Sequence, residues 1–373
     1  MRIFASTQRS ESFLQIDCIT ISVPDNCWFT LLYSLPSKKK KRRHFLLMLS
    51  CSCYCCYSCR FAFGSSVSIK GGVNMEVPHD DYDISIMIRV VKEVQELLTS
   101  KQFSTYSELD KEITNMLKGY KSIGDGFERF RIDLTKDAAN SPDLRSSLVD
   151  MNARCESRLR DFECSQKDQI NDMLPFIRST SRILVHGCGD LLALAIACAI
   201  QEREGVHFYI CEGRPATAKY PQGTGEALLR KASATHEGLK LKEKLQQYCT
   251  IIPDAGVGAV MSKVDFVVTG AYCVTEHGGL VHSTGSLQIA TVASAMNVPF
   301  YVLCETFKFA HIFPLSTADL RQPEGSSDVP LVEFVPPSMV TLVFSEQGIM
   351  PPSAVTYEMF RYHTALFAPG KCQ

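Results

Sequence analysis

The segment at 182–190 places two groups capable of catalysis next to each other. The apolar run RILVH ends at His186, and the letters GCGD follow, with Cys188 between two glycines. A thiolate is a nucleophile and an imidazole can move protons, so this pair could carry covalent or acid-base chemistry. The sequence around His186 shows no serine or carboxylate constellation for that task. We therefore interpret His186 as a hydrogen-bonded core histidine, and Cys188 as either a nucleophile or a small residue at a tight corner.

Three further loops carry polar or glycine-rich residues directly after strand-like stretches. They are EGRP, which contains Glu212 and Arg214, TGAY, which ends at Tyr272, and ETFKF at 305–309. Glycine and proline are typical of ordinary turns, so each loop alone fits a structural role. Together the loops indicate a ligand site, because ligands bind at the carboxyl ends of the strands in open α/β sheets.

Thr284, Gly285 and Ser286 precede an apolar-periodic run. If that run is a helix, free backbone N–H groups and two hydroxyls lie at its amino terminus and could bind an anion. An ordinary helix cap would contain the same residues. By contrast, GTGEALL at 223–229 lacks the third glycine of a dinucleotide fingerprint and does not directly follow a strand. We predict no cofactor and no metal site.

Five short stretches are rich in β-branched and aromatic residues, and they lie at 182–186, 207–212, 249–254, 265–271 and 299–305. The segments between them are long enough for crossover helices. Because the stretches are apolar throughout, we expect both of their faces to be buried, as in a parallel sheet between helices. The sequence predicts an α/β fold with a Rossmann-like parallel-sheet domain over residues 181–373.

The region before this sheet has a helical pattern. Apolar residues at three- and four-residue steps form one face of the segment 84–99, namely Ile84, Ile88, Val91, Val94 and Leu98. Similar patterns follow at 106–120 and 144–177. We predict an N-terminal helical domain over residues 75–180.

Residues 1–74 differ in composition from the rest of the chain. They contain the only tryptophan, Trp28, a basic run at 38–43 and an irregular cysteine-rich stretch at 44–63. Its apolar part is shorter than the about 20 residues of a membrane helix and begins too far along the chain for a secretory signal. A palmitoylated or metal-binding cysteine cluster and a nuclear address stay open. We favour a disordered segment or translated upstream sequence, with the functional chain beginning at Met75.

The composition limits the partners and the compartment. A net charge of −1 lacks the basic footprint of a nucleic-acid binder. Nine of the sixteen cysteines follow Met75 without paired spacing, which indicates a reduced, intracellular protein. We expect small core side chains at Cys198, Cys211, Cys273 and Cys304, and we expect Lys308, between two phenylalanines, to reach solvent along its aliphatic stem.

Two longer runs carry a resemblance to a known family. The run at 268–315 (VTGAYCVTEHGGLVHSTGSLQIATVASAMNVPFYVLCETFKFAHIFPL) and the run at 335–355 (VPPSMVTLVFSEQGIMPPSAV) resemble the regulatory subunits of eukaryotic translation initiation factor 2B and the sugar-phosphate isomerases that share their fold. The segment SIGDGFERFRIDL and the compact length after Met75 are most similar to the alpha-type subunits. The resemblance covers residues 82–367, and nothing in 1–74 belongs to it.

Two positions depart from the isomerase branch. Those isomerases convert an aldose phosphate, such as methylthioribose 1-phosphate or ribose 1,5-bisphosphate, to a ketose, with a cysteine directly after the strand-end histidine and an aspartate in the fourth loop. The matching residues here are Gly187 and Tyr272. Cys188 lies one residue, or about 3.8 Å of chain, further on, too far to inherit the role. Because each missing acid or base forfeits roughly 10²–10⁴ in rate, the resemblance implies no catalytic residues, with a rearranged isomerase as the alternative.

The binding loops are retained in part. The family's phosphate loop commonly reads Asn-Lys-Ile-Gly-Thr, whereas residues 282–286 read His-Ser-Thr-Gly-Ser and lack the lysine. The isomerases' Glu-x-Arg-Pro motif is present. The resemblance therefore implies a vestigial sugar-phosphate pocket formed by Glu212, Arg214, Thr284, Gly285 and Ser286.

The resemblance also implies a function and a set of partners. The chain would be a non-catalytic regulatory subunit in the cytosol, whose homodimer joins the beta–delta and gamma–epsilon subunits of the exchange complex, while epsilon catalyses nucleotide exchange. The helical domain would help to sense the phosphorylated alpha subunit of initiation factor 2 under stress, and Arg129, Arg131 and Lys136 are cations that suit a phosphate. A stand-alone dimer outside any complex is a further alternative. No membrane partner is expected.

Overall fold

The computed structural model describes residues 2–9, 15–23, 27–34, 49–51, 84–118, 120, 125–136, 143–214, 222–240, 245–320, 322 and 329–367. The chain divides into two compact units, Met1–Lys70 and Gly71–Gln373.

The first unit contains a small antiparallel sheet. Its strands pair in chain order, and they are β1 (Arg2–Arg9), β2 (Gln15–Val23), β3 (Cys27–Ser34) and β4 (Leu49–Cys51). The sequence pattern predicted no regular structure here. Whether residues 1–74 belong to the functional chain stays a prediction, and both the cysteines at 53–59 and Met75 lie outside the described residues.

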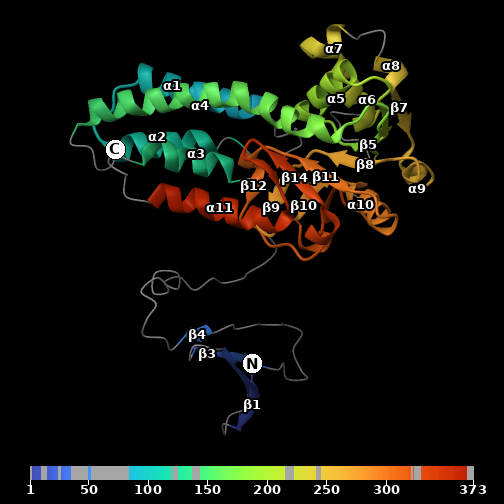
Figure 1. Ribbon diagram of the computed structural model, residues 1–373. Helices are drawn as coiled ribbons and strands as arrows, with labels where there is room; N and C mark the ends of the chain where they lie inside the picture. The colour runs from blue at the N-terminus through green and yellow to red at the C-terminus, as the bar shows by residue number, and fades with distance from the viewer. Residues whose placement is uncertain are drawn as a thin grey trace. The chain divides into compact units, whose positions relative to one another are not determined.

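The second unit begins with helices, as predicted. They are α1 (Ile84–Ser100), α2 (Tyr106–Lys118), α3 (Gly126–Thr135) and α4 (Leu144–Met173), which the 3-10 turn η3 (Leu174–Phe176) extends. Figure 1 shows α1 lying alongside α4. The apolar face of α1 is displaced slightly from the predicted one: Met87 and Val90 are buried, while Ile88 is only half-buried. Asp143 caps α4 by accepting hydrogen bonds from the backbone N–H groups of Arg145 and Ser146.

A seven-stranded sheet follows. Its order is β15-β14-β11-β8-β5-β6-β7, all parallel except the edge strand β15. The strands are β5 (Arg182–His186), β6 (His207–Cys211), β7 (Cys249–Ile252), β8 (Phe266–Thr269), β11 (Phe300–Leu303), β14 (Leu342–Ser345) and β15 (Gly348–Met350). All five predicted strands are present and parallel, which confirms the Rossmann-like sheet. The sequence reading missed β14 and β15.

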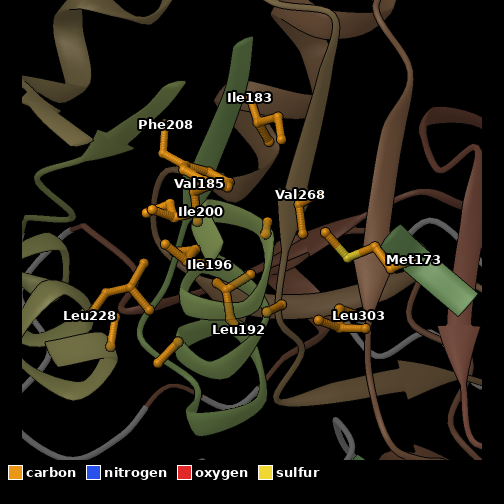
Figure 2. Packing of buried hydrophobic residues seen from close by; sticks show 14 of the residues in the cluster. Met173, Ile183, Val185, Leu192, Ile196, Ile200, Phe208, Leu228, Val268 and Leu303 are labelled. Atoms are coloured by element: carbon orange, nitrogen blue, oxygen red, sulfur yellow. The ribbon is translucent and has the colours of Figure 1, made fainter. Parts of the chain in front are cut away.

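Alternate residues of the central strands belong to two different cores. In β5, Ile183 and Val185 belong to one hydrophobic cluster and Leu184 belongs to another. Figure 2 shows the first cluster, in which Val185 and Phe208 of the sheet meet Ile196. Helices therefore cover both faces of the sheet, as the continuously apolar strands predicted.

The first core includes residues from the end of α4 and from α5 (Asp190–Glu202), α6 (Thr224–Ala234) and α8 (Leu245–Tyr248), while α7 (His236–Lys240) packs against α5 and α6. The second core includes residues of α9 (Val257–Met261), α10 (Ser286–Ala295) and α11 (Pro352–Phe367). Short 3-10 turns punctuate the loops: η4 (Asp254–Gly256), η5 (Thr306–Lys308), η6 (Thr317–Asp319) and η7 (Pro337–Met339).

A second, smaller sheet lies within the same unit. Its order is β12-β9-β10-β13, with bounds β9 (Cys273–Thr275), β10 (Leu280–Ser283), β12 (Phe309–Ala310) and β13 (Val332–Val335). Between β9 and β10 the chain turns at Gly278, which has φ +83° and no room for a Cβ beside the Pro352 carbonyl. The small sheet matters for function because β10 carries residues 282 and 283 to the end of β5.

Candidate functional site

The strand order places a topological switch point at the carboxyl ends of β5 and β8. From β5 the chain passes to β6 and β7 on one side, and it later continues through β8, β11 and β14 on the other side. Loops diverge at such a switch point, and ligands of open α/β sheets bind there. The residues after β5, the residues after β8 and the end of β10 meet at this switch point.

His186, the last residue of β5, is a buried and hydrogen-bonded histidine. Its Nε2 lies 3.1 Å from the Ser283 hydroxyl oxygen, and its backbone carbonyl accepts a hydrogen bond from Thr269. Burial lowers the pKa of His186 below its ordinary value, although the negative charge of Asp254 opposes this shift. The prediction of a core histidine is confirmed.

The space beside Gly187 is filled by a second histidine. Gly187 has φ +96°, and a Cβ there would lie 2.4 Å from Nε2 of His282, a distance that real Cβ atoms essentially never show. His282 is 4% exposed. Its ring stands edge-on to Tyr272 at 4.7 Å between centroids and to His186 at 5.6 Å. The imidazole of His282 thus occupies the place into which a side chain at position 187 would point.

His282 is held neutral in this position. Burial, together with the positive charge of Lys308 and the neighbouring His186, holds the pKa of His282 well below its ordinary value. Among the described residues, neither of its ring nitrogens makes a hydrogen bond of ordinary geometry. An unsatisfied buried polar group costs about 1–3 kcal/mol. The packing around the His282 ring therefore has to offset this cost.

The cysteines of the described chain are mainly core residues. Cys188 is 2% exposed and belongs to the hydrophobic cluster that contains α5, which fits a small residue at a tight corner. Cys211, Cys273 and Cys304 are fully buried, and burial raises the pKa of each thiol. The prediction of core cysteines is confirmed for these three, while Cys198 is half-buried.

Glu212 and Arg214 form a pair at the end of β6. The Arg214 guanidinium lies 2.8 Å from the Glu212 carboxylate. Asp254, after β7, accepts hydrogen bonds at 2.9 Å from the backbone N–H groups of Gly213 and Arg214. Asp254 therefore sets the course of this loop. Sequence reasoning missed it, although an aspartate directly after a predicted strand at the same sheet edge was the available signal.

The amino terminus of α10 already holds an anionic group. The Glu333 carboxylate, from β13, accepts hydrogen bonds from the backbone N–H groups of Gly285 and Leu287 at 2.9 and 3.0 Å. The Thr284 hydroxyl donates to the Pro330 carbonyl, and the Ser286 hydroxyl donates to the Ser283 carbonyl. The predicted anion site thus has the expected donors, and a carboxylate of the same chain satisfies two of them. No local sequence pattern links position 333 to this helix.

The five predicted ligand residues occupy two neighbouring groups. Within the described residues, no hydrogen bond or ion pair joins Glu212 or Arg214 directly to the residues at 284–286. The connection is indirect: the Gln288 side chain, in the first turn of α10, donates to the backbone carbonyl of Asp254 at 3.2 Å. One group therefore lies at the end of β6 in the large sheet and the other follows β10 of the small sheet, with Gln288 and Asp254 between them.

Lys308 does not reach solvent, contrary to the sequence-based expectation. Its ammonium lies 2.9 Å from the Glu305 carboxylate, and both side chains are buried. The reason is the position of η5, which packs against α3 and places Phe307 in the core of the helical region. A buried ammonium requires such a partner because desolvation of a lone charge is costly.

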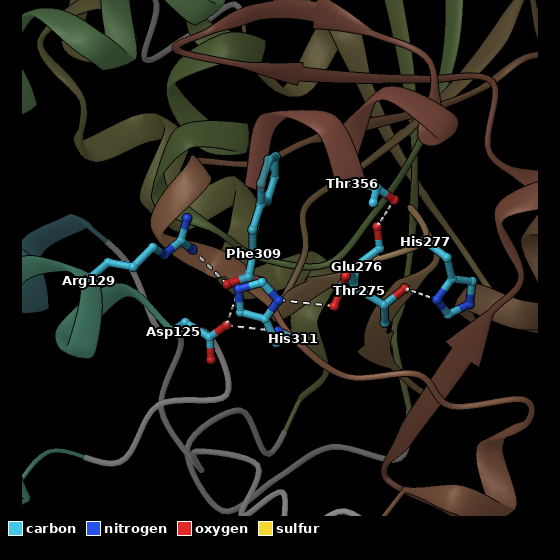
Figure 3. A network of polar contacts seen from close by, with 8 residues as sticks. All are labelled: Asp125, Arg129, Thr275, Glu276, His277, Phe309, His311 and Thr356. Carbon is cyan, nitrogen blue, oxygen red and sulfur yellow. Dashed lines mark hydrogen bonds and ion pairs between the residues drawn. The ribbon is translucent and has the colours of Figure 1, made fainter. Parts of the chain in front are cut away.

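Polar contacts join the helices to the sheet region (Figure 3). Arg129 of α3 donates to the backbone carbonyls of Thr306 and Phe309, each at 2.7 Å. Asp125 accepts a hydrogen bond from the backbone N–H of His311, whose Nδ1 lies 3.0 Å from a carboxylate oxygen of Glu276. Arg129 is 7% exposed, which corrects the expectation that it is a surface cation.

The described part of the chain shows neither a metal-binding cluster nor a helix suited to a membrane. No cluster of three or more histidine, cysteine, aspartate or glutamate side chains there could hold a metal ion. In the same residues, no helix combines the length and the apolar character needed to cross a membrane.

The fold defines an α/β protein with an N-terminal helical region followed by a Rossmann-like sheet. Residues 82–352 match the initiation factor 2 subunit family, and since this is well over half of the chain, the chain belongs to that family.

Individual relatives agree with this assignment. The translation initiation factor eIF2B subunit alpha of Dictyostelium discoideum is 28% identical over 316 residues, which cover 75% of this chain and 92% of that protein. The ribose 1,5-bisphosphate isomerase of Methanocaldococcus jannaschii is 25% identical over 200 residues, covering 50% of this chain and 60% of that protein. The crystal structure of the Pyrococcus horikoshii OT3 translation initiation factor eIF-2B has the same fold, with a TM-score of 0.57, 18% identity, and coverage of 74% of this chain and 94% of that one.

Proposed function

We propose that this chain is a non-catalytic regulatory subunit of the alpha type in the translation initiation factor 2B exchange complex of the cytosol. Family membership and the alpha-subunit relative support the subunit assignment. The observation that carries the non-catalytic part is the position of His282, which fills the space beside Gly187 where the isomerases have a cysteine side chain. Tyr272, in place of the aspartate, packs against that same imidazole.

An isomerase assay tests the non-catalytic part. The full chain is incubated with ribose 1,5-bisphosphate and with methylthioribose 1-phosphate, and the expected result is no ketose. Ketose formation that is lost in Cys188→Ala but kept in Cys198→Ala, a control on α5, would establish the isomerase alternative instead.

Copurification tests the subunit assignment. We expect the tagged chain, expressed in its native cell, to recover the beta, gamma, delta and epsilon subunits. Recovery of none of them, with the tagged chain itself dimeric, would favour a stand-alone dimer.

Self-association through the sheet domain is supported by a group of exposed apolar side chains, which we call the apolar surface. Its members are between 59% and 88% exposed, and they are Phe313, Leu315, Tyr357 and Phe360. These residues come from neighbouring segments. Phe313 stacks on His277, and the carbonyl of the adjacent Glu276 accepts a hydrogen bond from Thr356 on α11. Exposed apolar groups gathered in this way favour association, and we assign the surface to a second copy of the chain.

The proposed sensing of the phosphorylated alpha subunit of initiation factor 2 requires cations at the helical surface. Arg129 is excluded because its guanidinium is committed to two backbone carbonyls. Arg131 makes ion pairs with Asp110 and Glu128 at 2.7 and 2.6 Å, so a phosphate would have to compete with two carboxylates for it. Comparing the affinities of the wild type and Arg131→Gln for the phosphorylated and unphosphorylated partner tests this role; equal loss for both forms contradicts it.

A vestigial sugar-phosphate pocket is also part of the proposal. Arg214 is its accessible cation, because the side chain is 60% exposed. A phosphate at α10 would have to displace the Glu333 carboxylate from the backbone N–H groups of Gly285 and Leu287. We therefore expect weak binding of sugar phosphates. A thermal-shift titration with ribose 1,5-bisphosphate that gives no response in either the wild type or Glu333→Gln would remove the pocket.

A further inference from the structure

The small sheet is hydrogen-bonded to the helical region through one strand and to the end of β5 through another. Its edge strand β12 continues directly from η5 and pairs with β9, which in turn pairs with β10. The last residues of β10 are His282 and Ser283, and the Ser283 hydroxyl lies 3.1 Å from Nε2 of His186. A path of paired strands therefore leads from η5 to the residues that surround Gly187.

The amino terminus of α3 is held on η5 and β12 by polar contacts (Figure 3). Arg129 donates to the carbonyls of Thr306 and Phe309, each at 2.7 Å. The Phe309 carbonyl also accepts from the backbone N–H of Asp125 at 3.0 Å, and the Asp125 carboxylate accepts from the backbone N–H of His311 at 2.8 Å. Each contact uses a backbone group of the segment that contains β12, so α3 follows the position of that strand.

The strands along this path are buried. Phe309 of β12, Val274 of β9 and Val281 of β10 are each at most 1% exposed, and His282 is 4% exposed. Closely packed interiors have few voids into which a displaced group can relax, so they transmit strain. Among the described residues, no hydrogen bond joins the His282 ring to α3, so an influence of one on the other has to pass through intervening elements.

We propose that the small sheet couples the end of β5 to α3, so that displacement of the His282 imidazole changes how firmly α3 is held. In the structure this imidazole fills the space beside Gly187. A ligand that takes that space has to move the imidazole, and β10 carries the change to β9 and β12. The helical region then responds to the state of the switch point without contacting a ligand. The coupling is a property of the chain itself and does not rest on the proposed exchange complex.

A double-mutant cycle in the full chain measures the coupling. The equilibrium constant of unfolding is determined at one protein concentration for the wild type, His282→Ala, Arg129→Met and the double variant. Substitutions at independent sites combine within about twofold. We expect the double variant to be at least fivefold more stable than the product of the two single effects, because His282→Ala has already weakened the link that Arg129 completes.

Arg203→Met is the matched control. The Arg203 side chain also donates to two backbone carbonyls, those of Leu174 and Ile177, at 3.2 and 2.9 Å, but it connects the end of α5 to η3 and the residue after it. We expect its effect to combine with that of His282→Ala within twofold. Independent effects in the Arg129 cycle, or an equal deviation in both cycles, would overturn the proposal.

Hydrogen exchange separates the coupling from a general loss of stability. In His282→Ala we expect the amides of α3 to exchange at least threefold faster than in the wild type, and those of α1 to stay within twofold, because α1 packs mainly against α4. Equal acceleration in the two helices contradicts the proposal. Circular dichroism verifies that each variant is folded. If Arg129→Met does not fold, Asp125→Ala replaces it in the cycle; a deviation of threefold or more then supports the coupling, and independent effects contradict it.

Discussion

At the scale of single residues, the end of β5 is shaped by a contact between position 187 and position 282. The sequence alone indicated that Gly187 replaces a cysteine and that His282 replaces an asparagine of the family pattern. It gave no means of knowing that residues 187 and 282 touch, because 95 residues separate them and the contact depends on how the small sheet meets the large one. The isolated predictions at His186 and at the core cysteines succeeded because they needed only the local apolar context.

The contact at Gly187 makes a prediction for stability. We expect Gly187→Ala to lower the free energy of unfolding by about 2–4 kcal/mol, from a positive φ and from overpacking against His282. Gly348→Ala is the control for φ alone, because Gly348 has φ +103° and no atom within 4 Å of an added Cβ. Chemical denaturation is measured for both variants and for Gly187→Ala combined with His282→Ala. The comparison separates the cost of the positive φ from the cost of overpacking against His282. Equal losses in the two single variants would show that His282 does not obstruct position 187.

The buried histidines predict a pH dependence. Burial lowers the pKa of both His186 and His282 in the folded chain, so below the unfolded value of about 6.5 the unfolded chain binds more protons. Stability is therefore retained above pH 6.5 and falls as the pH drops below it, by up to about 1.4 kcal/mol per pH unit for each histidine. Denaturant titrations at pH 7.5, 6.5 and 5.5 measure the slope. His282→Gln should reduce it, and an unchanged slope would assign the effect to other groups.

At the scale of elements, long apolar stretches were predictable and short pairings were not. The five strands of the parallel sheet were predicted because burial on both faces requires continuous apolar runs. The small sheet was missed because its strands have two to four residues and come from segments far apart in the chain. The same reason explains why Glu333 was not recognised as the group that caps α10, since it lies 48 and 46 residues along the chain from the two N–H groups that it accepts.

The cap at α10 gives a second prediction for stability. We expect Glu333→Ala to lower the free energy of unfolding by about 1–3 kcal/mol, because two half-buried N–H groups lose their acceptor and the helix terminus loses a negative charge. Glu333→Gln should lower the free energy of unfolding by less than Glu333→Ala does, since glutamine keeps one side-chain oxygen as an acceptor. Glu226→Gln, at an exposed position in the first turn of α6, is the control and should have little effect. Thermal denaturation of the three variants provides the comparison, and a Glu333→Ala variant as stable as the wild type would contradict the role of the cap.

At the scale of the whole molecule, the sequence predicted the order of helical region and sheet, and the relatives agree with it. The sequence could not predict the apolar surface. In the segments that carry it, exposed apolar residues follow the same sequence pattern as core residues; the residues concerned are Phe313, Leu315, Tyr357 and Phe360. Only the arrangement of α11 beside the β9–β10 turn places them together at the surface.

The apolar surface makes a prediction for assembly. We expect the full chain to be a dimer in analytical ultracentrifugation, and we expect Leu315→Ser combined with Tyr357→Ser to raise the dissociation constant at least tenfold, because large apolar contacts are lost on both copies. Val149→Ser, at an exposed apolar position on α4, is the matched control and should leave the dimer intact. A double variant that dimerises like the wild type would exclude this surface as the interface.

The way in which Arg129 holds α3 has a consequence for how the chain can vary. Its two hydrogen bonds go to main-chain carbonyls of residues 306 and 309, so they depend on the path of the backbone and not on which side chains stand there. Point substitutions in this turn can leave the joint between helices and sheet intact, whereas an insertion or deletion of one residue would misalign both acceptors at once. Length, more than composition, is the property that we expect to be restricted in this segment.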